Sequence, residues 1–165
     1  MRTPTTRRRA LAWSGAAAAG LLAGCSNSSG TSGSAGTQRD TAVRKAAVRL
    51  RESATRTSLD LLAHYDALLK KHPGEAERLR PLRAEVARQA KVLRGEGRAA
   101  VGRPPVTVAA DPKAAVKELA AAEQRTSDAH LAALTGATPE LARLLASVAA
   151  AGAGHVFLLT DGEPK

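Results

Sequence analysis

The sequence predicts an all-α protein that folds as a bundle of four helices. From residue 38 onward, apolar side chains recur at the three- and four-residue spacing of a helix face. Segments rich in proline or glycine divide this region into helix-sized pieces. The chain has one tryptophan, one tyrosine and one phenylalanine, so its core must come from close packing of alanine and leucine. These observations favour two helical hairpins joined by a long connection.

Residues 1–24 have the order of an export signal. Basic residues come first, at Arg2, Arg7, Arg8 and Arg9. An apolar run over residues 10–22 and a small-residue segment ending at Gly24 follow. The run is shorter than the roughly 20 apolar residues that a membrane-spanning helix needs. We therefore interpret residues 1–24 as a signal peptide rather than a membrane span.

The segment Leu22-Ala23-Gly24-Cys25 resembles the bacterial lipobox. In that motif cleavage falls before the cysteine, here between Gly24 and Cys25, and the cysteine thiol carries a diacylglycerol. The resemblance implies a lipoprotein held on the outer face of the bacterial cell membrane, with membrane lipid as its partner through acylated Cys25. Two acyl chains give stable attachment, whereas one gives only marginal anchoring. Cys25 is the only cysteine and therefore has no partner for an internal disulfide.

The export route stays open between two alternatives. The segment Thr6-Arg7-Arg8-Arg9-Ala10-Leu11 resembles a twin-arginine signal, with Ala10 where that pattern prefers an aromatic residue. A basic start that happens to contain three adjacent arginines would equally serve general secretion.

The chain from Cys25 onward is long enough for one domain, with 141 residues, 21 basic side chains and 15 acidic ones. Residues 26–37 contain only Ser, Gly, Asn, Thr and Ala, so we expect residues 25–37 to form a flexible tether behind the lipidated cysteine. Tyr65 and Phe157 are the only aromatic residues left, which argues against nucleic-acid binding by base stacking. The positive charge is either a solvated helix surface or a surface for anionic headgroups.

The bundle is expected over residues 38–160, followed by a C-terminal tail at 161–165. The first helix ends at His72-Pro73-Gly74. Its upstream part, residues 38–57, is expected to be helical too, but it overshoots its partner, and a break is expected near Ser53. The second helix runs from about Glu75 to Arg94 and carries Pro81 near its start, where a kink is expected.

Residues 95–110 hold three glycines and the pair Pro104-Pro105, which predicts a loop. Sixteen residues can stretch up to about 50 Å and re-cross a helix about 30 Å long. The third helix begins at Asp111-Pro112, with Asp as N-cap and Pro at N1, and ends at Gly136. The fourth runs from about Glu140 to Leu159, and its small residues at 149–154 suit close approach by the third.

The segment Leu119-Ala-Ala-Ala-Glu123…His130 and the later segment Leu141…Val148…His155 resemble ferritin-like domains of exported bacterial proteins, over residues 50–159. The resemblance implies a ferritin-like four-helix bundle, with its long crossover between the second and third helices. It also implies a two-metal site, built from a Glu on each of two helices and a Glu-x-x-His on each of the other two.

Carried over residue by residue, this ligand set is incomplete. Gly152 and His155 take one pair of Glu-x-x-His positions, so the glutamate is missing there. Glu85 and Arg88 take the other pair, and arginine has no lone pair for a metal. On a helical wheel Arg88 points away from its apolar stripe and Glu85 lies at the edge.

Glu123, His130 and His155 fall inside their apolar stripes. The interpretation we favour is a buried hydrogen bond between Glu123 and His155 that needs no metal, so no cofactor is expected. The alternative is a single iron, manganese or zinc ion held by Glu123 and His155 with His130 or Glu85.

The sequence contains no Gly-rich phosphate loop, nucleophile elbow or Ser/His/Asp arrangement. The expected function is therefore a non-catalytic binding or structural role for a membrane-anchored extracytoplasmic lipoprotein. The sequence names no protein partner. A metal-binding lipoprotein with a reduced Glu/His site is the alternative.

Overall fold

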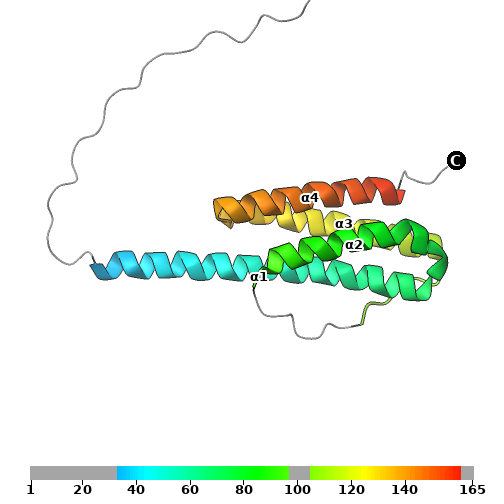
Figure 1. Cartoon of the computed structure of the whole chain (residues 1–165), viewed down its shortest axis with the longest axis horizontal. Helices are drawn as coiled ribbons and strands as arrows, with labels where there is room; N and C mark the ends of the chain where they lie inside the picture. Colours follow the sequence, from blue (N-terminus) through cyan, green and yellow to red (C-terminus); the bar gives the residue numbers. More distant parts are fainter. Residues whose placement is uncertain (1–32, 97–104, 161–165) are drawn as a thin grey trace, which may run out of the picture. The chain divides into compact units, whose positions relative to one another are not determined.

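The computed structural model describes residues 33–96 and 105–160, and all of the regular structure in these ranges is helical (Figure 1). The helices are α1 (Gly33–Lys71), α2 (Ala76–Arg94), α3 (Pro112–Ala132) and α4 (Pro139–Thr160), with 3₁₀ turns η1 (Pro73–Glu75) and η2 (Ala133–Gly136). The predicted all-α class is confirmed. The predicted signal peptide, Cys25 and the C-terminal tail lie outside the described residues.

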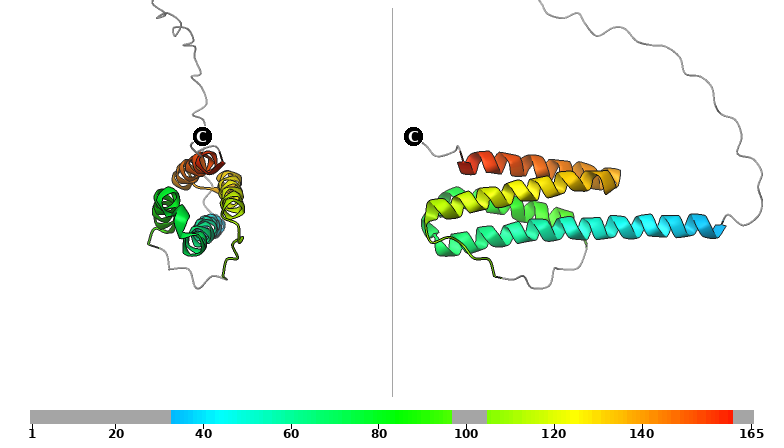
Figure 2. Two further views of the ribbon diagram at one scale, coloured as in Figure 1. Left: turned by 90° about the vertical axis from the view of Figure 1, so that its right-hand side faces the viewer. Right: turned by 180° about the vertical axis from the view of Figure 1, so that it is seen from behind.

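The four helices pack as two hairpins around a common core, which the end-on view of Figure 2 shows. One hairpin is α1 with α2, and the other is α3 with α4. The helix α1 also packs against α3, and α4 touches α2. Each helix therefore has a neighbour on both sides, and the core lies between them.

The two ends of the link between α2 and α3 lie at different heights along α1. At the end of α2, the carbonyl of Leu93 accepts a hydrogen bond from Arg51, in the middle of α1, at 3.3 Å. Just before α3, the carbonyl of Val108 accepts from Lys71, the last residue of α1, at 2.6 Å. The chain has therefore moved from the middle of α1 to its end, so α3 runs parallel to α2 and antiparallel to α1.

Local chemistry fixes the start of α3 and the end of α2 as the sequence predicts, whereas α3 ends at Ala132, four residues before the predicted end at Gly136. Asp111 caps α3, because its Oδ1 accepts a hydrogen bond from the amide of Ala114 at 2.7 Å. Gly95 ends α2 with a φ of 56°, a left-handed value that favours glycine. Pro81 lies inside α2, and the helix continues through it from Ala76 to Arg94.

The predicted break near Ser53 is wrong, because α1 is one helix of 39 residues. The hydroxyls of Thr55 and Thr57 donate to the carbonyls one turn earlier, at Arg51 and Ser53, without interrupting the helix. The helix also begins at Gly33, so residues 33–37 belong to α1 and not to the predicted tether. Adding a residue to an existing helix costs far less than starting one, which explains how α1 extends through weak helix formers.

The first part of α1 extends beyond the other helices (Figure 1). We call residues 33–49 the arm. Packing begins at Leu50, which contacts the apolar cluster around Leu141 and Leu145. Residues 36–46 of the arm are all exposed.

Two apolar clusters fill the core. The cluster near the α1–α2 turn includes Leu61, Leu68, Leu79, Val86, Val116, Leu119 and Leu159. The cluster near the α3–α4 turn consists of Ala54, Leu93, Leu141, Leu145 and Val148. Along α1, α3 and α4, buried polar residues separate the two clusters.

One described helix, α4, is long and apolar enough to cross a membrane by length and composition. One third of its most apolar stretch is buried inside the bundle. A helix that contributes to the core of a soluble protein meets the same criterion, and α4 supplies Leu141, Leu145 and Leu159 to the core.

Candidate functional site

We call six buried residues with polar side-chain atoms the polar layer. They come from α1, α3 and α4 and are Ser58, Tyr65, Glu123, Ser127, His130 and His155. Tyr65 belongs to the apolar cluster near the α1–α2 turn, and the other five lie between the two clusters. None of the six is more than 7% exposed. Buried polar groups are costly unless they are hydrogen-bonded, so the partners of each one decide what the layer can do.

Glu123 is the centre of the polar layer. Its Oε1 accepts a hydrogen bond from the hydroxyl of Tyr65 at 2.6 Å, and His155 Nδ1 lies 2.9 Å from the same oxygen. The predicted contact between Glu123 and His155 is therefore confirmed, and Tyr65 is an additional partner. One carboxyl group thus joins α1, α3 and α4.

Tyr65 remains a donor to Glu123 at any physiological pH. Burial, the charge of Glu123 and the hydrogen bond to it all raise the pKa of Tyr65 well above its ordinary value. The phenol is completely inaccessible to solvent. Its role is therefore to satisfy the carboxyl group of Glu123 and not to exchange a proton with solvent.

His130 belongs to a second pair in the layer. Its Nε2 lies 3.0 Å from the hydroxyl oxygen of Ser58, which joins α3 to α1. Burial lowers the pKa of His130, which favours the neutral imidazole. The candidate ligand His130 is thus bound to Ser58 and not to Glu123.

We expect His130 to make the protein less stable as the pH falls below neutral. The unfolded chain binds a proton at this histidine near pH 6.5, whereas the folded protein binds it only at lower pH. The stability that His130 contributes is present above pH 6.5 and is lost as the pH falls toward the folded pKa. Urea unfolding of the parent and His130→Gln across this range measures the effect, and the variant should lose less stability. Equal losses of stability in both proteins would show that His130 is not responsible for the pH dependence.

Ser127 has the one buried side-chain oxygen in the described residues that lacks a hydrogen-bond partner. It faces Gly152 on α4. A Cβ atom at Gly152 would come within 3.0 Å of Ser127 Oγ, closer than real Cβ contacts, and would lie 3.4 Å from Glu123 Oε2. The helices α3 and α4 therefore approach each other so closely here that a side chain at position 152 would displace the hydroxyl of Ser127.

Glu85, the fourth candidate ligand, is paired on its own helix. Its carboxylate accepts hydrogen bonds from Arg88 and from Gln89, the latter at 3.2 Å. These two bonds lower the pKa of Glu85, and its side chain is 38% exposed. The structure thus brings together Glu123 and His155, but it pairs His130 with Ser58 and Glu85 with Arg88.

The described residues do not fit a two-metal centre. The resemblance to ferritin-like domains assigns a glutamate ligand to position 152, where the chain has Gly152 and a side chain would meet Ser127 Oγ. It assigns a histidine ligand to position 88, where Arg88 is paired with Glu85. Among residues 33–96 and 105–160, no group of three or more His, Cys, Asp or Glu side chains is placed to hold a metal ion.

The helix α1 contributes Ser58 and Tyr65 to this layer, and neither contact is predicted from the sequence. Tyr65 and Ser58 both lie on the apolar stripe that carries Leu61 and Leu68. Two polar groups one heptad apart on a core-facing stripe are a signal that buried partners exist on another helix. That signal gives the face of the helix, but not which residues lie opposite.

Comparisons of the chain with protein-family models, with curated proteins and with solved structures find no match. The resemblance to ferritin-like domains therefore stays a prediction.

Proposed function

We propose that this protein is a lipid-anchored extracytoplasmic bundle of the ferritin-like type with a non-catalytic binding or structural role. In this proposal the polar layer holds the helices together where related bundles would hold metal ions. The observation that carries the proposal is Glu123, whose Oε1 is used by hydrogen bonds from Tyr65 and His155. A carboxyl group engaged in this way stabilises the protein without a metal.

The chain path supports the ferritin-like part of the proposal. The long link lies between α2 and α3, and α3 starts beside the end of α1. A single long crossover is the connection that distinguishes ferritin-like bundles from simple up-and-down bundles.

The burial of the polar layer supports a non-catalytic role. A group that acts on a substrate must be reached by it. Glu123 and His130 are each 1% exposed, and His155 is 7% exposed. A substrate could reach these residues only after the helices had separated.

The anchor is proposed from Leu22-Ala23-Gly24-Cys25, and Cys25→Ser tests it. In a bacterial host that processes lipoproteins, this variant should leave the membrane fraction or stay unprocessed, because the thiol that accepts the diacylglycerol is gone. Membrane fractionation and the mass of the N-terminal peptide measure the result. The neighbouring substitution Ser26→Ala is the control and should leave the protein in the membrane fraction. A Cys25→Ser protein with the distribution of the parent would refute the anchor.

A further inference from the structure

The arm of α1 is a charged helix that the bundle does not cover (Figure 1). It carries four basic residues, Arg39, Arg44, Lys45 and Arg49, and one acidic residue, Asp40. The arm therefore has a net charge of +3, which is half of the net charge of +6 on the chain from Cys25 onward. In the described part of the chain, none of the four basic groups is paired with a carboxylate.

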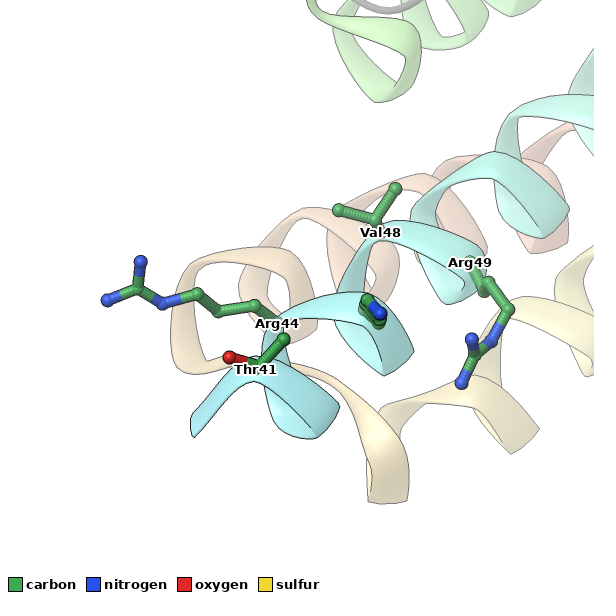
Figure 3. Close-up of a pocket in the computed structure, with 5 residues that line it drawn as sticks. Thr41, Arg44, Val48 and Arg49 are labelled. Carbon is green, nitrogen blue, oxygen red and sulfur yellow. The ribbon is translucent and has the colours of Figure 1, made fainter. Parts of the chain in front are cut away.

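The basic side chains lie on several sides of the arm. Figure 3 shows Arg44 and Arg49 extending in different directions from the turns that flank Val48. Together with Thr41 and Lys45, these residues line a shallow hollow along the helix. Val43 and Val48 are 63% and 56% exposed. Basic side chains that point in different directions from a helix are better placed to interact with many anionic groups on a surface than to hold one small ligand.

The arm is also close in sequence to the proposed anchor. Seven residues lie between Cys25 and Gly33, so the eight residue-to-residue steps span at most about 28 Å when fully extended. A lipid on Cys25 therefore keeps the start of the arm near the headgroups, where the surface potential of anionic lipids attracts basic residues.

We propose that the arm binds anionic lipid headgroups through Arg39, Arg44, Lys45 and Arg49. The inference rests on the proposed lipid anchor for the position of the arm, and it adds the headgroup class and the residues that recognise it. The arm contains no aromatic residue, so it lacks the stacking platforms of proteins that bind single-stranded nucleic acids. Downstream of Cys25, it is the basic segment nearest in sequence to the proposed anchor.

The test uses the chain without its lipid, from Ser26 to Lys165. The described helices and both apolar clusters lie within Gly33–Lys165, which is a compact unit by itself. The protein is sedimented with vesicles of phosphatidylcholine, with and without about one third phosphatidylglycerol, at about 20 mM and about 500 mM salt. Binding is expected only to the anionic vesicles and only at low salt. Absence of binding to anionic vesicles at low salt would overturn the proposal.

A charge-matched pair of variants locates the binding. The arm variant replaces four basic residues, as Arg39→Gln, Arg44→Gln, Lys45→Gln and Arg49→Gln. The control variant removes the same charge from exposed positions of the bundle, as Lys70→Gln, Arg80→Gln, Lys91→Gln and Lys117→Gln. The arm variant should bind at least about tenfold more weakly than the parent, and the control should stay within about threefold. Equal losses in the two variants would overturn the assignment to the arm.

Two further outcomes distinguish this proposal from a dimer formed through the arm and from membrane attachment by the lipid alone. The parent chain could instead fail to bind vesicles and form a dimer that the arm variant does not form. That result would show that the arm binds a second copy of the chain, and it would overturn the proposal. If vesicle binding fails while Cys25→Ser still releases the protein from membranes, the arm proposal is wrong and the lipid anchor stands. Both measurements use the helical content by circular dichroism as a check that each variant is folded.

Discussion

Replacing Glu123 with alanine is expected to lower the free energy of unfolding by about 3–5 kcal/mol. The substitution leaves the hydroxyl of Tyr65 and Nδ1 of His155 without their acceptor in a region that water does not reach. Each unsatisfied buried group costs about 1–3 kcal/mol, and the lost side-chain volume adds a cavity. Domains of this size are stable by about 5–15 kcal/mol, so the variant should unfold at much lower urea concentration.

Two variants on α3 serve as controls for Glu123→Ala. Glu123→Gln keeps an acceptor oxygen of the same shape and should cost about 1 kcal/mol. Asp128→Ala removes an exposed acid whose bond to Gln124 lies on the surface, and should change stability by less than about 0.5 kcal/mol. A Glu123→Ala protein within 1 kcal/mol of the parent would contradict the structural role.

Metal analysis of the same proteins tests the alternative function. The parent protein is purified without chelator and its metal content is measured. One equivalent of iron, manganese or zinc that is lost in Glu123→Gln would show that Glu123 holds a metal ion, which would contradict the purely structural role. The glutamine variant separates the two roles, because it can accept the hydrogen bonds but is a poor ligand for these metals.

The substitution Gly152→Ala is expected to lower the free energy of unfolding by about 1–3 kcal/mol. Alanine usually stabilises the interior of a helix relative to glycine, by about 0.5–1 kcal/mol. Here its Cβ would meet Ser127 Oγ at less than 3.0 Å, so α3 and α4 must separate or the serine must move. Gly154→Ala is the control, because it lies on the same helix with nothing within 4 Å, and it should gain the usual stability. Urea unfolding of both variants measures the difference.

The double variant with Ser127→Ala shows whether the serine hydroxyl is responsible. Ser127→Ala alone should stabilise the protein by about 1 kcal/mol, because it removes a buried oxygen without a partner. In the double variant the new Cβ faces the Cβ of residue 127 at 3.6 Å, which is an ordinary contact. The double variant should therefore be more stable than Gly152→Ala by more than the gain from Ser127→Ala alone. Strictly additive effects would contradict a direct contact.

The ends of the helices could be predicted from the sequence because the chemistry that fixes them is local. Asp111-Pro112 supplies a cap and a first-turn proline to α3, and His72-Pro73-Gly74 supplies a stop after α1. The expected break near Ser53 is wrong for the opposite reason, because contacts with distant residues decide the structure there. Serine and threonine are weak helix formers, but the residues after Leu50 pack against the rest of the bundle, and that packing outweighs their propensity.

The polar layer could be predicted only in part, because its contacts are between residues far apart in the chain. A short turn joins α3 to α4, and residues at equal distances on either side of that turn lie at the same height, so the sequence alone brings Glu123 close to His155. No such count places Tyr65, which is 58 residues from Glu123 and lies on a helix beyond the long link. The helical wheel gives the direction of a side chain but not its height relative to another helix. The contact between Gly152 and Ser127 depends on the distance between α3 and α4, which neither the count from the turn nor the helical wheel gives.

The polar layer also determines how far α1, α3 and α4 can slide past one another. Surfaces made largely of alanine and leucine are nearly uniform along their length, so an axial shift of one turn, about 5.4 Å, would exchange one set of apolar contacts for a similar one. The same shift would separate Glu123 from Tyr65 and His155, and His130 from Ser58. The hydrogen bonds thus select a single axial register for helices whose apolar residues alone would tolerate several.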